Sequence, residues 1–425
     1  MDATPACPVF FSTAFDGGNG ELTDAALSDD AVYTARLNMG KEPFTEGTDK
    51  REHHQWFYFK ASNLSGVARC VFKIVNAGSS SYPAAWPGTW AVASFGGQEE
   101  WVRTPTTYDA ETGELCVTVE IPPHQPHVYV AYFAPFTYEQ HLALIADCAS
   151  ARAPDGTSPL CAVSTLALTA QGREVQMITA GSGPLKLWFI ARQHPGESMA
   201  EWWAKGFLER LLSADDDLAR LLRTQATIRC VPNMCPDGAV LGHLRTNACG
   251  ANLNREWAPT GDYMAPTVER SPEVHAVLAA VTAIGCDLFV DVHGDEELPH
   301  IFFAGAQGIP GWNDRHAELY RLFATAQLKA CPAFQVEHGY GNEEIGEANM
   351  AICSDHMADQ FDCLAVTLEM PYKDTLELRE PAQGWSAPRC EKLGASMLEA
   401  VPTPANIYVI ALRFNWAVAP FLALI

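Results

Sequence analysis

Basic residues are scarce in this chain of 425 residues. Lysine and arginine together number 28 against 51 aspartates and glutamates, which gives a formal net charge of −23 at pH 7. Proteins that hold nucleic acid or adhere to anionic lipid need a basic face, so the composition argues against both functions. The same charge repels acidic ligands at long range. An acidic substrate would therefore need a local basic cluster.

A secretory signal and paired spacing of cysteines are also not visible in the sequence. Residues 1–7 show no positive stretch followed by an apolar run, which a signal peptide would have. The 13 cysteines are odd in number and lack paired spacing, so reduced thiols fit better than a disulfide framework. Cys230, Cys286 and Cys363 lie in or beside apolar runs and are expected to be small buried side chains. We predict a cytoplasmic protein.

One long apolar run is present, at residues 408–425, and only Arg413 and Asn415 give it polar side chains. A spanning helix needs about 20 mostly apolar residues, and this run is shorter and interrupted by Arg413 and Pro420. We therefore expect a packed terminal segment or a disordered tail at residues 401–425, and membrane contact is not expected. Internal repeats and low-complexity tracts are not visible.

The first part of the chain has the pattern of β-structure. Leu115, Val117, Val119 and Ile121 alternate with more polar residues, which is typical of a half-buried strand. Similar β-branched and aromatic content, separated by turns with glycine and proline, predicts further strands at residues 56–60, 70–75 and 127–133. The length and the 48% hydrophobic content allow two domains with sizeable cores. We predict an N-terminal antiparallel β-sandwich at residues 1–150.

Beyond residues 153–156 the period changes. Apolar side chains recur at helix spacing at residues 199, 203, 207 and 211, and residues 275–283 also have the pattern of a helix. A strand at residues 227–231 is followed by a predicted turn at residues 236–238. Alternating strands and helices predict a mixed, mostly parallel sheet with helices on both faces, an α/β/α domain at residues 151–400.

Three short motifs in this second part combine histidine with acidic residues. They are residues 194–197 with His194 and Glu197, residues 291–294 with His293, and residues 367–369 with Glu369. Each follows a short apolar run that is expected to be a buried strand, at residues 185–190, 288–290 and 364–366. Open α/β sheets place ligands outside the carboxyl ends of their strands, so the motifs should meet in one crevice. Two histidines and one glutamate form a catalytic zinc set, and the second glutamate is free to act as a base.

Each motif alone is weak, because a histidine three residues from a glutamate often forms a surface hydrogen bond. Their joint occurrence at successive strand ends predicts the metal site. A histidine that binds a metal usually donates its other N–H to a carboxylate or a carbonyl. Asp291, Asp295 and Glu296 are candidates for that partner of His293, although solvated or structural roles fit them equally well.

Arg245, Asn254 and Arg255 lie between the first two motifs. Arg255 could be a solvated charge, and Arg245 could be a surface loop residue. A planar guanidinium beside an asparagine amide also has the geometry needed to hold a carboxylate through two hydrogen bonds. An exopeptidase must recognise such a carboxylate.

In their order and spacing, these motifs resemble those of the M14 zinc carboxypeptidases, specifically the cytosolic carboxypeptidase branch. Members of that branch carry a β-sandwich before the catalytic domain, and residues 56–59 and 132–136 resemble that module. The similarity covers roughly residues 40–395. The resemblance implies one zinc ion bound by His194, Glu197 and His293. It also implies that Glu369 is the general base that activates a zinc-bound water.

The resemblance implies two further roles. Arg245 would stabilise the oxyanion, and Asn254 with Arg255 would bind the terminal carboxylate of the substrate. Asn252 departs from the family, which often has aspartate before Leu-Asn-Arg, and it is expected to support the loop. The implied activity is hydrolysis of the C-terminal peptide bond of peptides or protein tails.

Two alternatives stay open. A zinc amidohydrolase acting on N-acyl amino acids or cell-wall peptides shares the metal set, and a catalytically silent binding module is a different class that the intact Glu369 argues against. Eukaryotic relatives remove glutamates from protein tails, so acidic residues are one expected substrate and would require basic pocket residues. Lys373 and His356 are unassigned candidates for that task, and Tyr340 and Tyr372 receive no role. The oligomeric state is not predicted.

Overall fold

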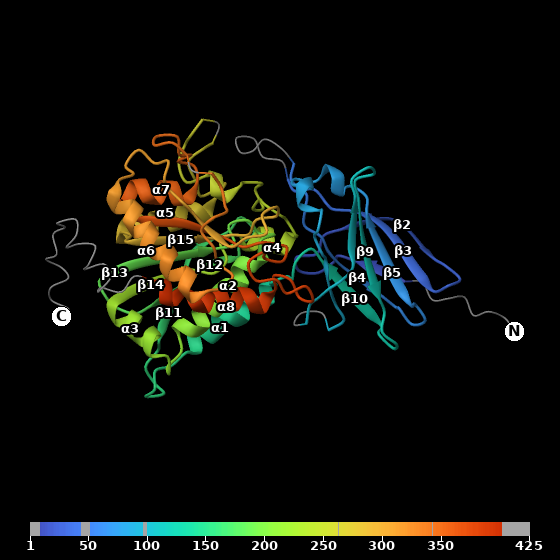
Figure 1. The fold of residues 1–425 in the computed structure, drawn as a ribbon. Coiled ribbons are helices and arrows are strands. Elements are labelled where there is room, and N and C mark those ends of the chain that lie inside the picture. Colours follow the sequence, from blue (N-terminus) through green and yellow to red (C-terminus); the bar gives the residue numbers. More distant parts are fainter. Residues whose placement is uncertain (1–8, 44–51, 97–99, 262, 342, 402–425) are drawn as a thin grey trace.

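The computed structural model describes residues 9–43, 52–96, 100–261, 263–341 and 343–401. They form two bodies, a β-sandwich from the first part of the chain and a larger α/β domain from the rest (Figure 1). The apolar run at residues 408–425 lies outside the described residues, and so do the predictions made for it. Within the described ranges, no helix combines the length and apolar character that a membrane crossing requires.

The first domain consists of two five-stranded sheets. One has the strand order β1 (Phe10–Ser12), β4 (Tyr58–Ser62), β10 (His127–Ala131), β6 (Val92–Ser94) and β7 (Val102–Arg103). The other has the order β2 (Glu21–Leu27), β3 (Val32–Asn38), β5 (Arg69–Ile74), β9 (Glu114–Glu120) and β8 (Thr106–Asp109). Phe59 of β4 and Phe72 of β5 meet between the sheets, with ring centroids 4.8 Å apart. Two short 3-10 turns, η1 (Ala77–Ser79) and η2 (Pro83–Ala85), follow β5.

The predicted β-sandwich is confirmed. The alternating run forms β9, in which Leu115, Val117 and Val119 are at most 3% exposed, and the three other predicted strands are β4, β5 and β10. One pairing differs from the antiparallel expectation, because β3 and β5 are parallel. After β3 the chain forms β4 in the opposite sheet and then returns as β5, so the two strands run in the same direction.

The second domain is built on a seven-stranded mixed sheet. Its strand order is β11 (Cys161–Leu168), β12 (Glu174–Ala180), β14 (Ala226–Val231), β13 (Leu185–Ala191), β15 (Leu288–Val292), β17 (Leu364–Glu369) and β16 (Phe302–Gly305). The four inner strands β14, β13, β15 and β17 are parallel, and the outer strands pair in the antiparallel direction. All five residues of β15 and all six of β17 are buried, as expected for strands covered on both faces.

Helices cover both faces of this sheet. Leu187 and Phe189 of β13 belong to the apolar cluster that includes α2 (Ser198–Leu211), α6 (Asp314–Ala330) and α8 (Ala387–Ala400). Trp188 and Ile190 point to the other face, toward α5 (Pro272–Ile284) and α7 (Cys353–Phe361). Two more helices, α1 (Tyr138–Ser150) and α3 (Asp217–Gln225), lie beside α2 on the first face (Figure 1). The predicted α/β/α architecture is confirmed.

The helices predicted from the spacing are α2 and α5. The turn predicted at residues 236–238 is wrong, because these residues begin the short helix α4 (Pro236–Leu241). Pro236 occupies the first helical turn, where its missing N–H costs nothing, and Gly242 ends the helix with a left-handed φ of 69°. The cysteines that the structure describes are free, and Cys230, Cys286 and Cys363 are buried as expected.

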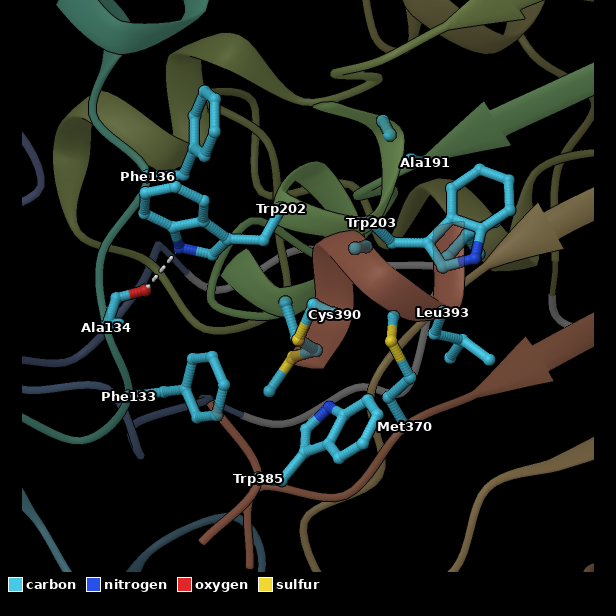
Figure 2. Close-up of a cluster of buried hydrophobic side chains, with 14 of the residues drawn as sticks. Phe133, Ala134, Phe136, Ala191, Trp202, Trp203, Met370, Trp385, Cys390 and Leu393 are labelled. Atoms are coloured by element: carbon cyan, nitrogen blue, oxygen red, sulfur yellow. Dashed lines mark hydrogen bonds between the residues drawn. The ribbon is translucent and has the colours of Figure 1, made fainter. Parts of the chain in front are cut away.

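The two domains are joined by a buried segment. Phe133, Ala134 and Phe136 lie around Trp202 of α2, whose indole N–H donates to the Ala134 carbonyl at 3.1 Å (Figure 2). Ser198 donates to the same carbonyl at 2.9 Å. The predicted division into residues 1–150, 151–400 and 401–425 stays a prediction.

Candidate metal and substrate site

The three sequence motifs meet at one edge of the second sheet. β13 pairs with β15, which pairs with β17, all in parallel, so their carboxyl ends lie side by side. His194 and Glu197 occupy the turn after β13, His293 follows the last residue of β15, and Glu369 is the last residue of β17. The topology therefore brings all four side chains to the predicted place.

His194, Glu197 and His293 form a compact cluster. The Nδ1 atom of His194 lies 2.7 Å from Oε1 of Glu197, and the Nδ1 atom of His293 lies 2.8 Å from Oε2 of Glu197. The two Nδ1 atoms are 3.2 Å apart. Zinc bonds of about 2.0–2.1 Å place the ligands of a tetrahedral site roughly 3.4 Å apart, so two imidazole nitrogens and a carboxylate at this spacing fit such an ion.

The opposite nitrogen of each imidazole has a buried partner. Nε2 of His293 lies 2.9 Å from Oδ2 of Asp291, and Nε2 of His194 lies 3.0 Å from Oδ1 of Asn252. These contacts orient both rings with Nδ1 toward the cluster. Of the three acids considered as partners of His293, the structure places Asp291 in contact with it. Asn252, expected only to support its loop, contacts His194 directly.

The charges within the cluster follow from burial and proximity. Burial lowers the pKa of His194 to about 4, an effect that Glu197 opposes and Arg245 reinforces. Burial alone would raise the pKa of Glu197, but His194 and His293 lower it below its usual range. Burial would lower the pKa of His293, but Asp291 and Glu197 raise it well above its usual range. A neutral His194 and an ionised Glu197 are the forms that bind a metal, whereas His293 would release a proton on binding.

Glu369 lies beside the cluster with one free oxygen. Its Oε1 accepts a hydrogen bond of 3.1 Å from the Tyr340 hydroxyl, and its buried Oε2 has no hydrogen-bond partner among the described residues. Burial raises the pKa of Glu369 well above its usual range, with His293 lowering it and Glu197 and Asp295 raising it. Glu369 is also one of the residues that line the cleft.

The two tyrosines that received no role lie in different surroundings. The Tyr340 hydroxyl has one proton, which is shared between Oδ2 of Asp295 at 2.7 Å and Oε1 of Glu369 at 3.1 Å, so Tyr340 belongs to the site. It lies in a long segment without regular secondary structure, where the sequence offers no periodicity to place it. Tyr372 donates to the Gly196 carbonyl at 2.8 Å and stacks on Tyr132, so it supports the turn that carries His194 and Glu197.

Arg245, Asn254 and Arg255 all line the same cleft, together with the metal cluster and Glu369. Arg245 is 9% exposed and lies close enough to His194 to influence its charge. Asn254 is fixed by a hydrogen bond of 2.8 Å from the Cys353 N–H to its Oδ1. Arg255 donates to the Asn254 carbonyl at 2.8 Å. The structure thus places two guanidinium groups in one cleft with the cluster.

The cleft has a volume of about 1040 Å³, and many of its lining side chains are acidic. Besides Glu197 and Glu369, they are Asp295, Glu296, Glu297, Glu337, Glu343 and Asp355. Burial raises the pKa of Asp355 to about 7, with Glu343 raising it and Arg255 lowering it. Lys373 and His356 are not among the described lining residues, and Lys373 instead donates to the Pro87 carbonyl at 3.1 Å.

Comparisons with known proteins cover both domains. The profile of the cytosolic carboxypeptidase N-terminal domain matches residues 11–133, and the zinc carboxypeptidase profile of peptidase family M14 matches residues 153–389. An uncharacterized protein of Zymomonas mobilis is 40% identical over 387 residues, which cover 91% of this chain and 94% of that one.

Two solved structures extend the comparison. A metallo-carboxypeptidase from Burkholderia cenocepacia is 38% identical, with a TM-score of 0.83 and coverage of 96% of this chain and 100% of that one. A metallo-carboxypeptidase from Pseudomonas aeruginosa, solved in complex with (2-guanidinoethylmercapto)succinic acid, is 38% identical with a TM-score of 0.81. That match covers 95% of this chain and 100% of the other.

Proposed function

This chain belongs to the M14 zinc carboxypeptidases, with a first domain of the cytosolic carboxypeptidase type, and we propose how this metallocarboxypeptidase uses its cleft. It binds one zinc ion through His194, Glu197 and His293 and hydrolyses the C-terminal bond of peptides or protein tails. The observation that carries the proposal is the compact cluster of two Nδ1 atoms and one carboxylate, with Glu369 beside it in the same cleft.

The zinc ion would act as a Lewis acid toward the scissile carbonyl and the attacking water, and its positive charge would favour the ionised form of Glu369. Glu369 accepts the proton of that water through its unpartnered Oε2 and later gives it to the leaving amine. The hydrogen bond from Tyr340 to Oε1 leaves Oε2 free for this task and limits the rotation of the carboxylate. Glu369 is therefore proposed as the general base.

The two arginines bind different negatively charged groups of the substrate. Arg245, near His194, stabilises the oxyanion that forms at the scissile carbonyl, and such donors are worth about 10²–10³ in rate. Arg255 binds the terminal carboxylate, because a buried carboxylate is costly without a cationic partner. The Asn254 carbonyl accepts a hydrogen bond from Arg255, and the Asn254 side chain is proposed to bind the terminal carboxylate together with Arg255. This spacing would set the scissile bond one residue from the chain end.

The charges of the cleft also bear on which C-terminal residue of the substrate is released. The sequence predicts acidic residues as one possible substrate, and their release would need basic side chains in the pocket. Among the described residues that line the cleft, Arg245 and Arg255 are the only lysines or arginines, and both have other proposed tasks. The Pseudomonas aeruginosa relative was solved with a compound whose name contains a guanidino group and a succinic acid. Together with Asp355 and Glu343, this supports a neutral or basic terminal residue over an acidic one. Peptides that differ only in the last residue decide between them.

The zinc assignment is tested by metal analysis. Purified wild-type protein should contain one zinc per chain, and His293→Ala should lose most of it because a ligand is gone. His275→Ala is the matched control, since His275 is exposed on α5. Full zinc occupancy in His293→Ala would remove this residue from the site.

The exopeptidase assignment is tested with paired substrates. Arg255→Ala should strongly reduce kcat/KM for a peptide with a free C-terminus and scarcely change residual cleavage of the amidated peptide. Arg321→Ala, at an exposed position of α6 that pairs with Glu318, serves as the control. Equal cleavage of both peptides by the wild-type protein would favour the zinc amidohydrolase alternative, and no cleavage by zinc-loaded protein would favour the silent binding module.

A cytoplasmic location is part of the proposal. Its support is the cytosolic carboxypeptidase type of the first domain. Separation of cell compartments followed by immunodetection tests it.

A further inference from the structure

The loop that carries Arg245 is held by a residue of the first domain. Glu42 follows β3 in the chain and is 4% exposed. Its Oε1 accepts the N–H of Leu244 at 2.6 Å, and its Oε2 accepts the N–H of Thr246 at 2.8 Å. The N–H of Arg245 lies 3.1 Å from both oxygens, and the Thr246 hydroxyl donates at 2.8 Å. One carboxylate thus binds three consecutive backbone N–H groups and a hydroxyl.

This arrangement suits a carboxylate rather than an amide. Consecutive N–H groups that point to one centre form an anion-binding concavity, and here the anion is part of the protein. An ionised carboxylate only accepts hydrogen bonds and has room for all of these donors, whereas an amide would turn an NH₂ group toward one of them. Residues 243–247 form neither helix nor strand, so their buried N–H groups depend on such a partner.

The loop at residues 243–247 contacts the turn between His194 and Glu197 and also contributes to the lining of the cleft. The carbonyl of Leu244 accepts the N–H of Gly196 at 2.8 Å, and Gly196 lies in the turn between His194 and Glu197. A Cβ atom on Gly196 would lie 2.8 Å from the Cα of Leu244, so the loop and the turn are in close contact. The side chain of Arg245 lines the cleft beside the first-domain residue Tyr82, with the guanidinium 5.9 Å from the ring centroid.

We propose that Glu42 is a positioning residue through which the first domain orders the Arg245 loop and completes the catalytic site. The inference rests on the proposed function, specifically on the role of Arg245 at the oxyanion. The proposal gives the β-sandwich a role in catalysis, because without the Glu42 carboxylate three backbone N–H groups of the loop would lose their hydrogen-bond partner. Glu42 is not among the described residues that line the cleft, so it is proposed to act through the loop.

Amide exchange tests the ordering of the loop without any use of activity. In the full-length protein, Glu42→Gln should speed hydrogen exchange at residues 244–246 by at least about 10-fold, since a lost hydrogen bond opens these amides to water. Glu114→Gln is the matched control, because Glu114 pairs with Arg36 and Lys73 within the first domain. Unchanged exchange at residues 244–246 in Glu42→Gln would overturn the proposal.

Kinetics test the link to Arg245. Glu42→Gln should lower kcat by roughly 10–100-fold, the range found for supporting partners of a site, with zinc content and KM little changed. In an Arg245→Ala background the same substitution should cause little further loss, because the two residues act as a unit. Losses that multiply would mean that Glu42 acts by another route, and the proposal would be wrong.

Two outcomes separate this inference from the proposed function. If Arg245→Ala alone leaves kcat unchanged, the oxyanion role of Arg245 fails, and amide exchange alone then decides whether Glu42 orders the loop. If Glu42→Gln does not fold, Thr246→Val replaces it, since this variant removes one donor to Glu42 and keeps the side-chain shape. It should raise exchange at residues 244–246 and lower kcat in the same direction by a smaller factor, and the absence of both changes would contradict the proposal.

Discussion

Glu369 is the residue on which the proposed chemistry depends most directly. Its two oxygens differ, because Oε1 is held by Tyr340 and the buried Oε2 has no partner among the described residues. The unpartnered Oε2 is therefore the oxygen proposed to accept the proton. The surrounding cleft is rich in acids, so the identity of the base has to be established by substitution.

Glu369→Gln keeps the shape of the side chain and removes its ability to accept a proton. We expect kcat to fall by at least about 10²–10⁴-fold, the range of general base catalysis, with zinc content and fold unchanged. Steady-state kinetics and metal analysis of the same preparation measure both. Glu297→Gln is the control, because Glu297 is an exposed acid of the same cleft. A comparable kcat in Glu369→Gln would assign the base to another residue.

A second buried acid should make stability depend on pH. Glu273 is fully buried, and burial raises its pKa from the ordinary 4.5 to about 7, with Asn247 lowering it and Asp237 and Glu256 raising it. Because the folded protein then binds more protons than the unfolded chain between about pH 4.5 and 7, the free energy of unfolding falls as the pH rises through this window.

Glu273→Gln should remove this dependence, since the amide is neutral at every pH. At pH 8 the variant should be more stable than the wild-type protein by up to roughly 3 kcal/mol, and the difference should vanish toward pH 4.5. Chemical denaturation at both pH values under saturating zinc measures it, with the exposed Glu269→Gln as the control. Parallel pH profiles of variant and wild type would show that Glu273 is not the group responsible.

At the scale of elements, the sequence predicted what periodicity determines. The alternation in β9, the helix spacing in α2 and the buried runs of β13, β15 and β17 are local patterns, and parallel strands fix where their ends meet. The cluster of His194, Glu197 and His293 could therefore be predicted as a group.

Contacts between distant or irregular segments could not be predicted in this way. Glu42 meets the Arg245 loop across more than two hundred residues of chain, and nothing in the sequence around either one marks the pair. Tyr340 lies in an irregular segment, and its contact with Glu369 follows only from the path of the chain. The sequence does not predict the start of α4, because proline and glycine occur both in turns and at helix ends.

The packing of α2 on α8 leads to a prediction at this scale. A Cβ atom on Gly394 of α8 would lie 2.0 Å from the Trp203 carbonyl oxygen, and one on Gly206 of α2 would lie 2.0 Å from the Glu391 carbonyl oxygen. The two helix backbones are therefore in direct contact, and Trp203 and Leu393 pack beside this crossing (Figure 2). Alanine would favour each helix by about 1 kcal/mol, but it would also force the helices apart.

We expect Gly394→Ala to destabilise the protein by about 1–3 kcal/mol, the cost of overpacking a core. Lys392→Ala, at an exposed position of the same helix, should change stability little. Equilibrium denaturation of both variants measures the difference. A Gly394→Ala variant that is as stable as the wild-type protein, or more stable, would show that α2 and α8 can move apart at little cost in free energy.

At the scale of the whole molecule, the two domains share one apolar core. A single cluster of buried side chains runs from Tyr33 and Leu115 in the β-sandwich to Leu393 and Val401 at the end of α8. Buried polar contacts cross the same boundary, among them the bond from the Arg192 guanidinium to the Phe136 carbonyl at 2.7 Å. A first domain bound in this way cannot unfold without exposing apolar surface of the second.

We therefore expect one cooperative unfolding transition for the whole protein, although chains of this size often show one transition for each domain. Leu115 lies wholly inside the β-sandwich and is 0% exposed. Leu115→Ala should cost about 2–5 kcal/mol, and it should lower the temperature of the entire transition, including the loss of carboxypeptidase activity in the second domain. Calorimetry and residual activity after heating should shift together. The domains are independent if calorimetry resolves two peaks, the substitution moves only one of them, and activity survives heating as in the wild-type protein. In that case the contacts between Glu42 and the Arg245 loop must break without unfolding the catalytic site.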